Sequence, residues 1–259
     1  MNNNQLNTIH LGDAETVLKN IPDKFVDMVM TSAPYDNLRR YNGIGDTWNH
    51  NKFMAIAKEL VRVLKDGGVI VWVINDKTEK GSETGTSFRQ ALYFMELGLN
   101  LNDTMIWKKT NPCPSIKQSR YNQVFEYMFV FSKGMPKTFN PLMVPCKCAG
   151  KKYDSTCKNI DGESGRTKKT FNINKEKVAP NIWEIAVAQN KTGHPAVFPI
   201  DIPLRHIMSW TNENDIVLDP FIGSGTTALA AIQLNRKYIG IDMSEEYYNI
   251  TLDRIKELI

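Results

Sequence analysis

Blocks of apolar residues recur near both ends of the chain, with spacings typical of alternating strands and helices. Continuous apolar runs rich in β-branched residues predict buried strands, and apolar residues three and four positions apart predict helices with one buried face. The Asp-Gly-Gly run at 66–68 is expected to end the second helix. The predicted strands cover 8–11, 26–31, 69–74, 101–107, 124–131, 215–219 and 238–242, and the predicted helices cover 14–19, 51–64, 87–97, 200–209, 226–234 and 244 onward.

A parallel sheet follows from this order, because most predicted strands are followed by a helix that can cross back over the sheet. The exception is the pair at 101–107 and 124–131, which no predicted helix separates, so these strands are expected to form an antiparallel hairpin. We find no internal repeat. The predicted fold is therefore α/β, with a mostly parallel sheet and one antiparallel hairpin.

The middle of the chain breaks this pattern. Apart from the strand at 124–131, residues 110–180 lose hydrophobic periodicity and are rich in Lys, Asn, Pro and Gly. The segment is too polar for core and too long for an ordinary connection, so it is predicted to be an inserted functional segment. Residues 108–177 contain 15 Lys or Arg and five acids, a net charge of +10, whereas the rest of the chain carries −6. This asymmetry favours a polyanionic partner, although a soluble Lys-rich loop would have the same composition.

Composition excludes several classes of protein. A chain of 259 residues with 42% hydrophobic residues can bury a large core. No apolar run approaches the ~20 residues of a membrane span, and the polar start lacks a signal-peptide pattern, so we expect a cytoplasmic protein without membrane contact. Cys113, Cys146, Cys148 and Cys157 lack the paired spacing of a zinc site. We therefore expect free thiols and no metal.

One glycine-containing loop follows a predicted strand and opens a predicted helix. In the sequence Asp-Pro-Phe-Ile-Gly-Ser-Gly-Thr-Thr at 219–227, Gly223 and Gly225 allow a sharp turn and the close approach of a ligand. Asp242 ends the next predicted strand, where its carboxylate can accept hydrogen bonds from ribose hydroxyls. A tight turn followed by a strand-end acid would give the same residues without a ligand.

The loop lacks both features that bind phosphate chains, the Gly-x-Gly-x-x-Gly fingerprint and a P-loop lysine. A nucleoside without phosphates, such as S-adenosylmethionine, therefore fits better. Phe221 would lie beside its adenosine, and Asp219 or neighbouring backbone groups would meet its ammonium end. Asp13 starts a predicted helix near the same edge of the sheet, where an N-terminal cap is a simpler role than contact with the adenosine.

Ser-Ala-Pro-Tyr at 32–35 follows the strand at 26–31 and offers what methylation of an exocyclic amine needs. The lone pair of such an amine is delocalised into the base, so two acceptors aimed at its hydrogens favour the charged transition state. The Ser32 hydroxyl and the Ala33 carbonyl suit this task, and Tyr35 can stack on a base that has left the duplex. A Pro-Tyr turn at a strand end is the alternative without chemistry.

The order of these motifs, Ser-Ala-Pro-Tyr first and the glycine loop last, resembles the beta group of DNA amino-methyltransferases. The resemblance covers nearly the whole chain and includes 183–185 and 193–199. It implies a Rossmann-like, S-adenosylmethionine-dependent methyltransferase sheet with circularly permuted motif order. Its catalytic half would be 1–109, its target-recognition insertion 110–180 and its cofactor-binding half 181–259. Double-stranded DNA is the implied partner, while a cognate restriction endonuclease and the choice between monomer and homodimer stay open.

Under this resemblance the site residues fall into three sets. The catalytic set is Ser32, Ala33, Pro34 and Tyr35. The cofactor-binding set is Asp13, His194, Pro195, Phe198, Asp219, Pro220, Phe221, Gly223, Ser224, Gly225, Thr226, Thr227 and Asp242. The DNA-binding set is Arg39, Arg40, Lys108, Lys109, Lys117, Arg120, Lys151, Lys152, Arg166, Lys168 and Lys169. Candidate base readers are Asn111, Gln118, Arg120, Asn122, Gln123 and Arg166, although phosphate contact or solvation is the commoner role of such residues.

Ala33 departs from the family pattern, which has proline at this position. Its carbonyl persists, and Pro34 still favours extended geometry at Ala33. A freed φ and an added N–H are nevertheless expected to weaken the positioning of the loop. A natural weak variant and a substitution that suppresses turnover both stay open.

Serine at position 32 is associated in this family with cytosine. We therefore expect site-specific methyl transfer to the N4 amine of a flipped cytosine, with adenine N6 as the alternative. A catalytically silent, nucleic-acid-binding methyltransferase scaffold is the alternative from another class. Methylation of a protein amide or an RNA base is disfavoured, because relatives with those activities usually place the glycine loop first.

Overall fold

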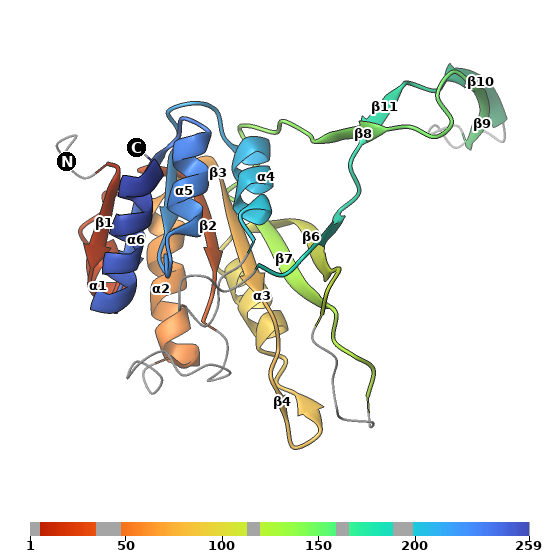
Figure 1. Ribbon diagram of the computed structural model, residues 1–259. Helices are drawn as coiled ribbons and strands as arrows, with labels where there is room; N and C mark the ends of the chain where they lie inside the picture. Colours follow the sequence, from red (N-terminus) through yellow and green to blue (C-terminus); the bar gives the residue numbers. More distant parts are fainter. Residues whose placement is uncertain (1–5, 35–47, 113–119, 159–165, 189–198, 259) are drawn as a thin grey trace. The chain divides into compact units, whose positions relative to one another are not determined.

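The computed structural model describes residues 6–34, 48–112, 120–158, 166–188 and 199–258 (Figure 1). Contacts divide the chain into two compact units, one of Met1–Asn140 with Asn181–Ile259 and one of Pro141–Pro180. The larger unit holds the main sheet and the helices that the structure describes. No helix among the described residues is long and apolar enough to cross a membrane.

An eight-stranded sheet forms the centre of the larger unit, with strand order β1-β14-β13-β2-β3-β7-β6-β12. Neighbouring strands run parallel, except that β7 is antiparallel to both β3 and β6. The predicted α/β sheet and its antiparallel hairpin are thus confirmed. The strands are β1 (Thr8–Leu11), β2 (Val26–Ser32), β3 (Leu64–Ile74), β6 (Asn100–Lys109), β7 (Phe125–Ser132), β12 (Ile182–Ile185), β13 (Ile216–Asp219) and β14 (Lys237–Asp242).

Helices cover both faces of this sheet (Figure 1). Contacts link α1, α2 and α3 into one layer, and α4, α5 and α6 into the other. The step from β2 to β3 runs in one direction across the sheet, and the step from β13 to β14 runs in the opposite direction. Right-handed crossovers in opposite directions place their helices on opposite faces of the sheet, which explains this arrangement. The helices are α1 (Ala14–Leu18), α2 (His50–Val63), α3 (Thr86–Glu96), α4 (Asp201–Trp210), α5 (Thr226–Gln233) and α6 (Glu245–Leu258), each close to its predicted range.

An aromatic cluster holds α2 and α3 against β3. The ring centroids of Phe53 and Phe94 lie 5.8 and 5.2 Å from that of Trp72, and all three side chains are fully buried. The indole N–H of Trp72 donates a 2.8 Å hydrogen bond to Gln90 Oε1, so its polar group is satisfied. Burying each such ring contributes about 2–3 kcal/mol. The cluster therefore fixes β3 beside β2, whose end carries the Ser-Ala-Pro-Tyr motif.

The start of β3 differs from its prediction. α2 ends at Val63 and β3 begins directly after it at Leu64, so 66–68 lie inside the strand and not between the helix and a strand that starts at 69, as predicted. Gly67 has a φ of 76° and donates its N–H to Lys133 O at 2.7 Å. A Cβ at Gly68 would lie 2.9 Å from Asp27 O. The two glycines allow an irregular strand start, which resembles a turn in sequence.

The smaller unit consists of exposed two-stranded sheets. β8 (Met143–Pro145) pairs with β11 (Glu176–Val178), and β9 (Lys152–Lys158) pairs with β10 (Arg166–Asn172), both antiparallel. None of its described residues is buried. The sequence does not predict these strands, because strands exposed on both faces show no apolar alternation. The edge strand β12 and a short hairpin of β4 (Thr78–Glu79) and β5 (Ser82–Glu83) also escape prediction.

Candidate active site

The two predicted loops lie side by side at the carboxyl end of the sheet. β2 and β13 are parallel neighbours, with Met28 opposite Val217 and Val29 opposite Leu218. Ser32 ends β2 and Asp219 ends β13. Because adjacent parallel strands end at the same edge, the structure brings Ser32, at the start of the tetrapeptide, and the glycine loop together there.

The Asp219 carboxylate joins three parts of this edge. Its Oδ1 accepts hydrogen bonds from Thr31 Oγ1 at 2.6 Å and from the Phe221 N–H at 3.0 Å, while its Oδ2 accepts one from Thr227 Oγ1 at 2.6 Å. The residue is 1% exposed, and this burial raises the pKa of its carboxyl to about 6. Asp219 and the loop backbone are the two predicted partners for the ammonium end of a ligand. Because both carboxylate oxygens of Asp219 already accept hydrogen bonds, the loop backbone is the favoured partner.

The glycine loop is anchored from behind by α6. Thr251 Oγ1 donates to Gly223 O at 2.7 Å, and the Arg254 guanidinium donates to Ser224 O. Gly225 has a φ of 84°, and a Cβ there would lie 2.7 Å from Thr251 Cγ2. Glycine is therefore needed at 225 both for its backbone conformation and for the close approach of α6.

Asp242, at the end of β14, contacts the same loop. Its Oδ2 accepts from the Gly223 N–H at 2.9 Å and its Oδ1 accepts from the Ser244 N–H at 2.8 Å. Burial raises the pKa of this carboxyl to about 6. The side chain stays partly exposed, and each carboxylate oxygen keeps a lone pair beyond these bonds. It can therefore accept hydrogen bonds from a ligand's hydroxyl groups.

Phe221 belongs to an aromatic wall beside the loop. Its ring centroid lies 5.2 Å from Trp48 and 6.2 Å from Trp72, both in edge-on geometry. Phe221 is partly exposed, whereas Pro220 before it is buried. Trp48 is not among the residues predicted from sequence, because it follows a polar stretch without periodicity. An edge-on aromatic wall next to a hydroxyl acceptor suits a nucleoside.

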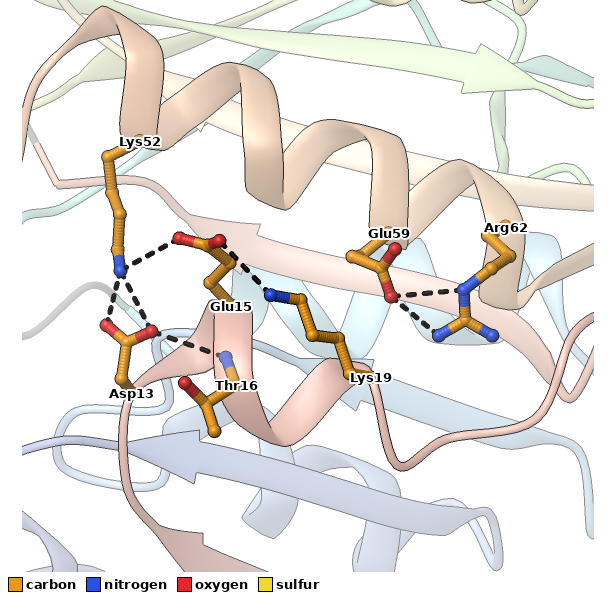
Figure 2. A network of polar contacts seen from close by, with 7 residues as sticks. All are labelled: Asp13, Glu15, Thr16, Lys19, Lys52, Glu59 and Arg62. Atoms are coloured by element: carbon orange, nitrogen blue, oxygen red, sulfur yellow. Dashed lines mark hydrogen bonds and ion pairs between the residues drawn. The ribbon is translucent and has the colours of Figure 1, made fainter.

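Asp13 is confirmed as an N-terminal cap and also takes part in a charge network (Figure 2). Its Oδ1 accepts from the Thr16 N–H at 3.3 Å, and Lys52 of α2 lies 2.7 Å from its Oδ2. Lys52 also bonds Glu15 at 3.2 Å, and Glu15 in turn bonds Lys19 at 3.4 Å. Burial opposes the charge on Lys52, but its bonds to Asp13 and Glu15 outweigh this and raise its pKa. The network ties the start of α1 to the first turn of α2.

The Ala33 N–H is used in the structure. It donates a 3.1 Å hydrogen bond to Val73 O, and so extends the pairing of β2 with β3 beyond Ser32. The Ala33 side chain is 2% exposed. The added N–H, expected to weaken positioning, is instead a strand contact that proline at 33 could not make.

Three of the predicted DNA-binding residues are paired within the larger unit. Lys108 lies 2.7 Å from Glu184, Lys109 lies 2.6 Å from Glu126, and Arg120 bonds Thr78 and lies 3.5 Å from Glu83. Phosphate contact at these residues would compete with the pairs. Lys151 and Lys152, in the smaller unit, are exposed.

Two predicted base readers also have partners in the larger unit. Asn111 Oδ1 accepts from the Val187 N–H at 2.7 Å, and Gln123 Nε2 donates to Asn75 Oδ1 at 2.7 Å. Asn122 also has an interaction partner. Of Arg166, Lys168 and Lys169 the structure gives only the β10 backbone. Tyr35, Arg39, Arg40, Lys117, Gln118, His194, Pro195 and Phe198 lie outside the described residues.

The residues present fit S-adenosylmethionine on two observations. Asp242 offers acceptors for ribose hydroxyls, and Phe221 offers an apolar edge for the adenine. The buried Thr226 Oγ1, at the start of α5, has no hydrogen-bond partner among the described residues and is a further polar group for a ligand nearby. Among the residues in contacts that the sequence analysis did not predict, Thr31 alone could have been found from the sequence, because it is a polar residue next to the apolar run of β2.

Free thiols are confirmed at Cys146 and Cys148. Cys113 lies outside the described residues, and only the backbone of Cys157 is described. Within the described part of the chain, no group of three or more His, Cys, Asp or Glu side chains could hold a metal ion.

Comparison with known proteins agrees with this geometry. A family model described as a DNA methylase matches residues 26–253. The orphan methyltransferase M.BamHII of Bacillus amyloliquefaciens is 50% identical over 93% of this chain and 92% of its own length. Among solved structures, the cytosine-N4-specific PvuII DNA methyltransferase has a TM-score of 0.70 at 22% identity, over 97% of this chain and 90% of its own. M1.HpyAVI in complex with SAM has a TM-score of 0.65 at 24% identity, over 96% and 98%.

The two solved structures show that the fold is that of DNA methyltransferases. The family match spans both motifs, from the strand before Ser-Ala-Pro-Tyr to the helix behind the glycine loop. Because that match covers most of the sequence and M.BamHII is half identical along nearly its whole length, this chain belongs to the N6/N4 family of DNA methylases.

Proposed function

We propose that the chain transfers a methyl group from S-adenosylmethionine to the exocyclic N4 amine of a cytosine flipped out of duplex DNA. The observation that carries this proposal is the Thr31–Asp219 hydrogen bond, which holds Ser32 beside the glycine loop. The solved structure of M1.HpyAVI is a complex with SAM, which supports the same cofactor here.

Ser32 and Ala33 would act on the target amine. The Ser32 hydroxyl and the Ala33 carbonyl would accept hydrogen bonds from the two amine hydrogens and favour the charged transition state. As the nitrogen gains the methyl group, it releases one of these protons to solvent water. Pro34 keeps Ala33 extended, and Tyr35 stacks on the flipped base. S-adenosylmethionine, when bound, supplies an electrophilic methyl group on its sulfonium.

The glycine loop and its neighbours would hold the cofactor. Asp242 accepts from the ribose hydroxyls, Phe221 borders the adenine, and the loop backbone meets the amino acid end. The Thr226 hydroxyl, which has no hydrogen-bond partner in the described part of the chain, is available to the same ligand. His194, Pro195 and Phe198 complete the proposed set through the family resemblance. Asp13 contributes as the cap that joins α1 to Lys52.

Cytosine is favoured over adenine as the target base on two grounds. Serine stands first in the tetrapeptide, and the name of the PvuII neighbour specifies cytosine N4. Both bases present similar amine hydrogens to Ser32 and Ala33. Adenine N6 is therefore the alternative product that the test must distinguish.

Duplex DNA is the proposed partner, with 110–180 as the target-recognition insertion between the catalytic half at 1–109 and the cofactor half at 181–259. Within it, Pro141–Pro180 carries nine Lys or Arg and four acids. Tyr153 and Phe171 face each other across β9 and β10 and are exposed. Exposed aromatics among lysines suit nucleic acid.

We place the activity in the cytoplasm. M.BamHII is named an orphan methyltransferase, so we propose that this chain likewise requires no endonuclease partner.

Methylation of duplex DNA by the purified protein tests the proposal. Wild type and Ser32→Ala are incubated with DNA and methyl-labelled cofactor, and the nucleosides are separated by mass spectrometry. N4-methylcytosine from wild type and a loss of at least about 100-fold in Ser32→Ala are expected. N6-methyladenine would reverse the choice of base. Cofactor binding without transfer would support the silent scaffold instead.

A further inference from the structure

Thr31 is a fully buried polar residue directly before the tetrapeptide. We propose that Thr31 is a positioning residue, which couples the glycine loop to Ser32 through the Asp219 carboxylate. The inference rests on the methyl transfer proposed above.

Packing at position 31 does not require the hydroxyl of Thr31. Its neighbours in β2, Met28, Val29 and Met30, are apolar and 0% exposed, so a valine would fill the same space. A buried hydroxyl loses its hydration and is tolerated only if it finds a partner. Thr31 finds it in Asp219 Oδ1 at 2.6 Å, across 188 positions of sequence.

The Asp219 carboxylate also accepts hydrogen bonds from the proposed cofactor-binding elements. The same Oδ1 accepts from the Phe221 N–H at 3.0 Å, which fixes the start of the glycine loop. Oδ2 accepts from Thr227 Oγ1 at 2.6 Å, in the first turn of α5. One carboxylate therefore sets the loop, the helix behind it and the strand that ends in Ser32.

Ser32 is consequently held from both neighbouring strands. On the β3 side, the Ala33 N–H donates to Val73 O at 3.1 Å. On the β13 side, β2 pairs only through Met28 and Val29 in the described register, and the Thr31 side chain adds a link to β13 one residue before Ser32. Loss of the Thr31 hydroxyl would leave both loops folded but free to shift relative to each other. Such a shift slows group transfer more than it weakens ligand binding.

The test compares Thr31→Val with Thr31→Ser, which keeps the hydroxyl. Calorimetry gives the Kd for S-adenosylmethionine, and single-turnover assays give the transfer rate. We expect Thr31→Val to lower the rate about tenfold or more with less than about a twofold change in Kd, and Thr31→Ser to stay within about threefold of wild type. Thr227→Val, which removes a bond from the cofactor side of the same carboxylate, is expected to raise the Kd.

A pH profile separates coupling from a general loss of structure. Without the Thr31 donor, the Asp219 carboxylate is less stabilised, so the acid limb of the rate profile should move to higher pH in Thr31→Val and not in Thr31→Ser. Among the described residues, Asp242 is the other titratable group that acts on Asp219, and we expect its bonds from the Gly223 and Ser244 N–H groups to persist in all variants.

Several results would overturn the inference. A Thr31→Val enzyme with the wild-type rate and profile contradicts coupling, and so does one whose Kd for S-adenosylmethionine rises in proportion as its rate falls. If Thr31→Val does not fold, Thr31→Ser and Thr31→Ala, both lacking the methyl group, provide the same comparison. Absence of transfer by wild type would contradict the proposed function and this inference together, whereas an active wild type with an unaffected Thr31→Val contradicts the inference alone.

Discussion

The backbone N–H of Ala33 distinguishes this tetrapeptide from one with proline in the second position. Ala33→Pro would remove the bond to Val73 O and lower the free energy of unfolding by about 1 kcal/mol. The bond from the Ala33 N–H already fixes the backbone that carries the Ala33 carbonyl. Fixing φ at position 33 with proline should therefore raise the transfer rate by about fivefold at most. Chemical denaturation and single-turnover assays measure both effects, with Ala33→Gly, which keeps the N–H, as control. A rate increase of about 100-fold would show that proline rigidity outweighs the bond.

His206 of α4 introduces a pH dependence of stability. The centroid of its ring lies 4.5 Å from that of Trp183, and neither ring nitrogen has a hydrogen-bond partner among the described residues. Burial lowers its pKa to about 3, whereas the unfolded chain has a histidine pKa of about 6.5. The unfolded chain therefore takes up a proton first, and the stability due to neutral His206 is lost as pH falls from 6.5 toward 3.

The measurable result is a difference between wild type and His206→Leu. Between pH 8 and pH 5, wild type should lose about 2 kcal/mol more free energy of unfolding than the variant does. The raised pKa values of Asp219 and Asp242, about 6, act in the opposite direction, because the folded chain then binds their protons first. Both proteins share these carboxyls, so their contribution cancels. Equal losses in the two proteins would contradict the assignment to His206.

Among the elements, α1 and α2 are joined by Lys52 near their first turns and by Arg62, which donates to Leu18 O at 2.9 Å, near their last turns. Lys52 is 23% exposed and its acidic partners 31%, so the ion pairs contribute about 1 kcal/mol or less and weaken with salt. Lys52→Met should lower the free energy of unfolding by about that amount at low salt and by less at 1 M salt. Lys19→Met, which removes the more exposed 3.4 Å pair with Glu15, is the matched control. A loss in Lys52→Met that does not change with salt would point to packing instead.

The elements that the sequence predicts are those with one buried face. β2 and α5 have clear apolar patterns, and their predicted limits agree with the structure to within a residue or so. β9 and β10 have none; their described side chains, at 152–154 and 170–172, are all exposed, and pairing holds the two strands together. The site follows the same division. Ser32 and Gly225 lie in local motifs, whereas Thr251 meets the glycine loop only through tertiary packing, which no local pattern reveals.

The molecule as a whole separates a well-packed unit from an exposed basic one. The larger unit buries the aromatic cluster and the Asp219 junction. The smaller unit, Pro141–Pro180, has no buried residue among those described, yet it carries a net charge of +5. A segment of this size without a core gains little stability from its own burial. Its exposed lysines and aromatics therefore matter through what they bind, which makes DNA affinity the property to test.

Salt dependence of duplex binding tests that division directly. Each lysine that neutralises a phosphate adds about 0.9 to the slope of log affinity against log salt. Replacing both Lys151 and Lys152, which are exposed, by glutamine should reduce the slope by about 2 and leave the Kd for S-adenosylmethionine unchanged. Lys108→Gln, whose charge is already paired with Glu184 at 2.7 Å, should change the slope little. If Lys108→Gln lowers the slope by about 1 and the double replacement does not lower it, the DNA lies along the larger unit and the smaller one has another role.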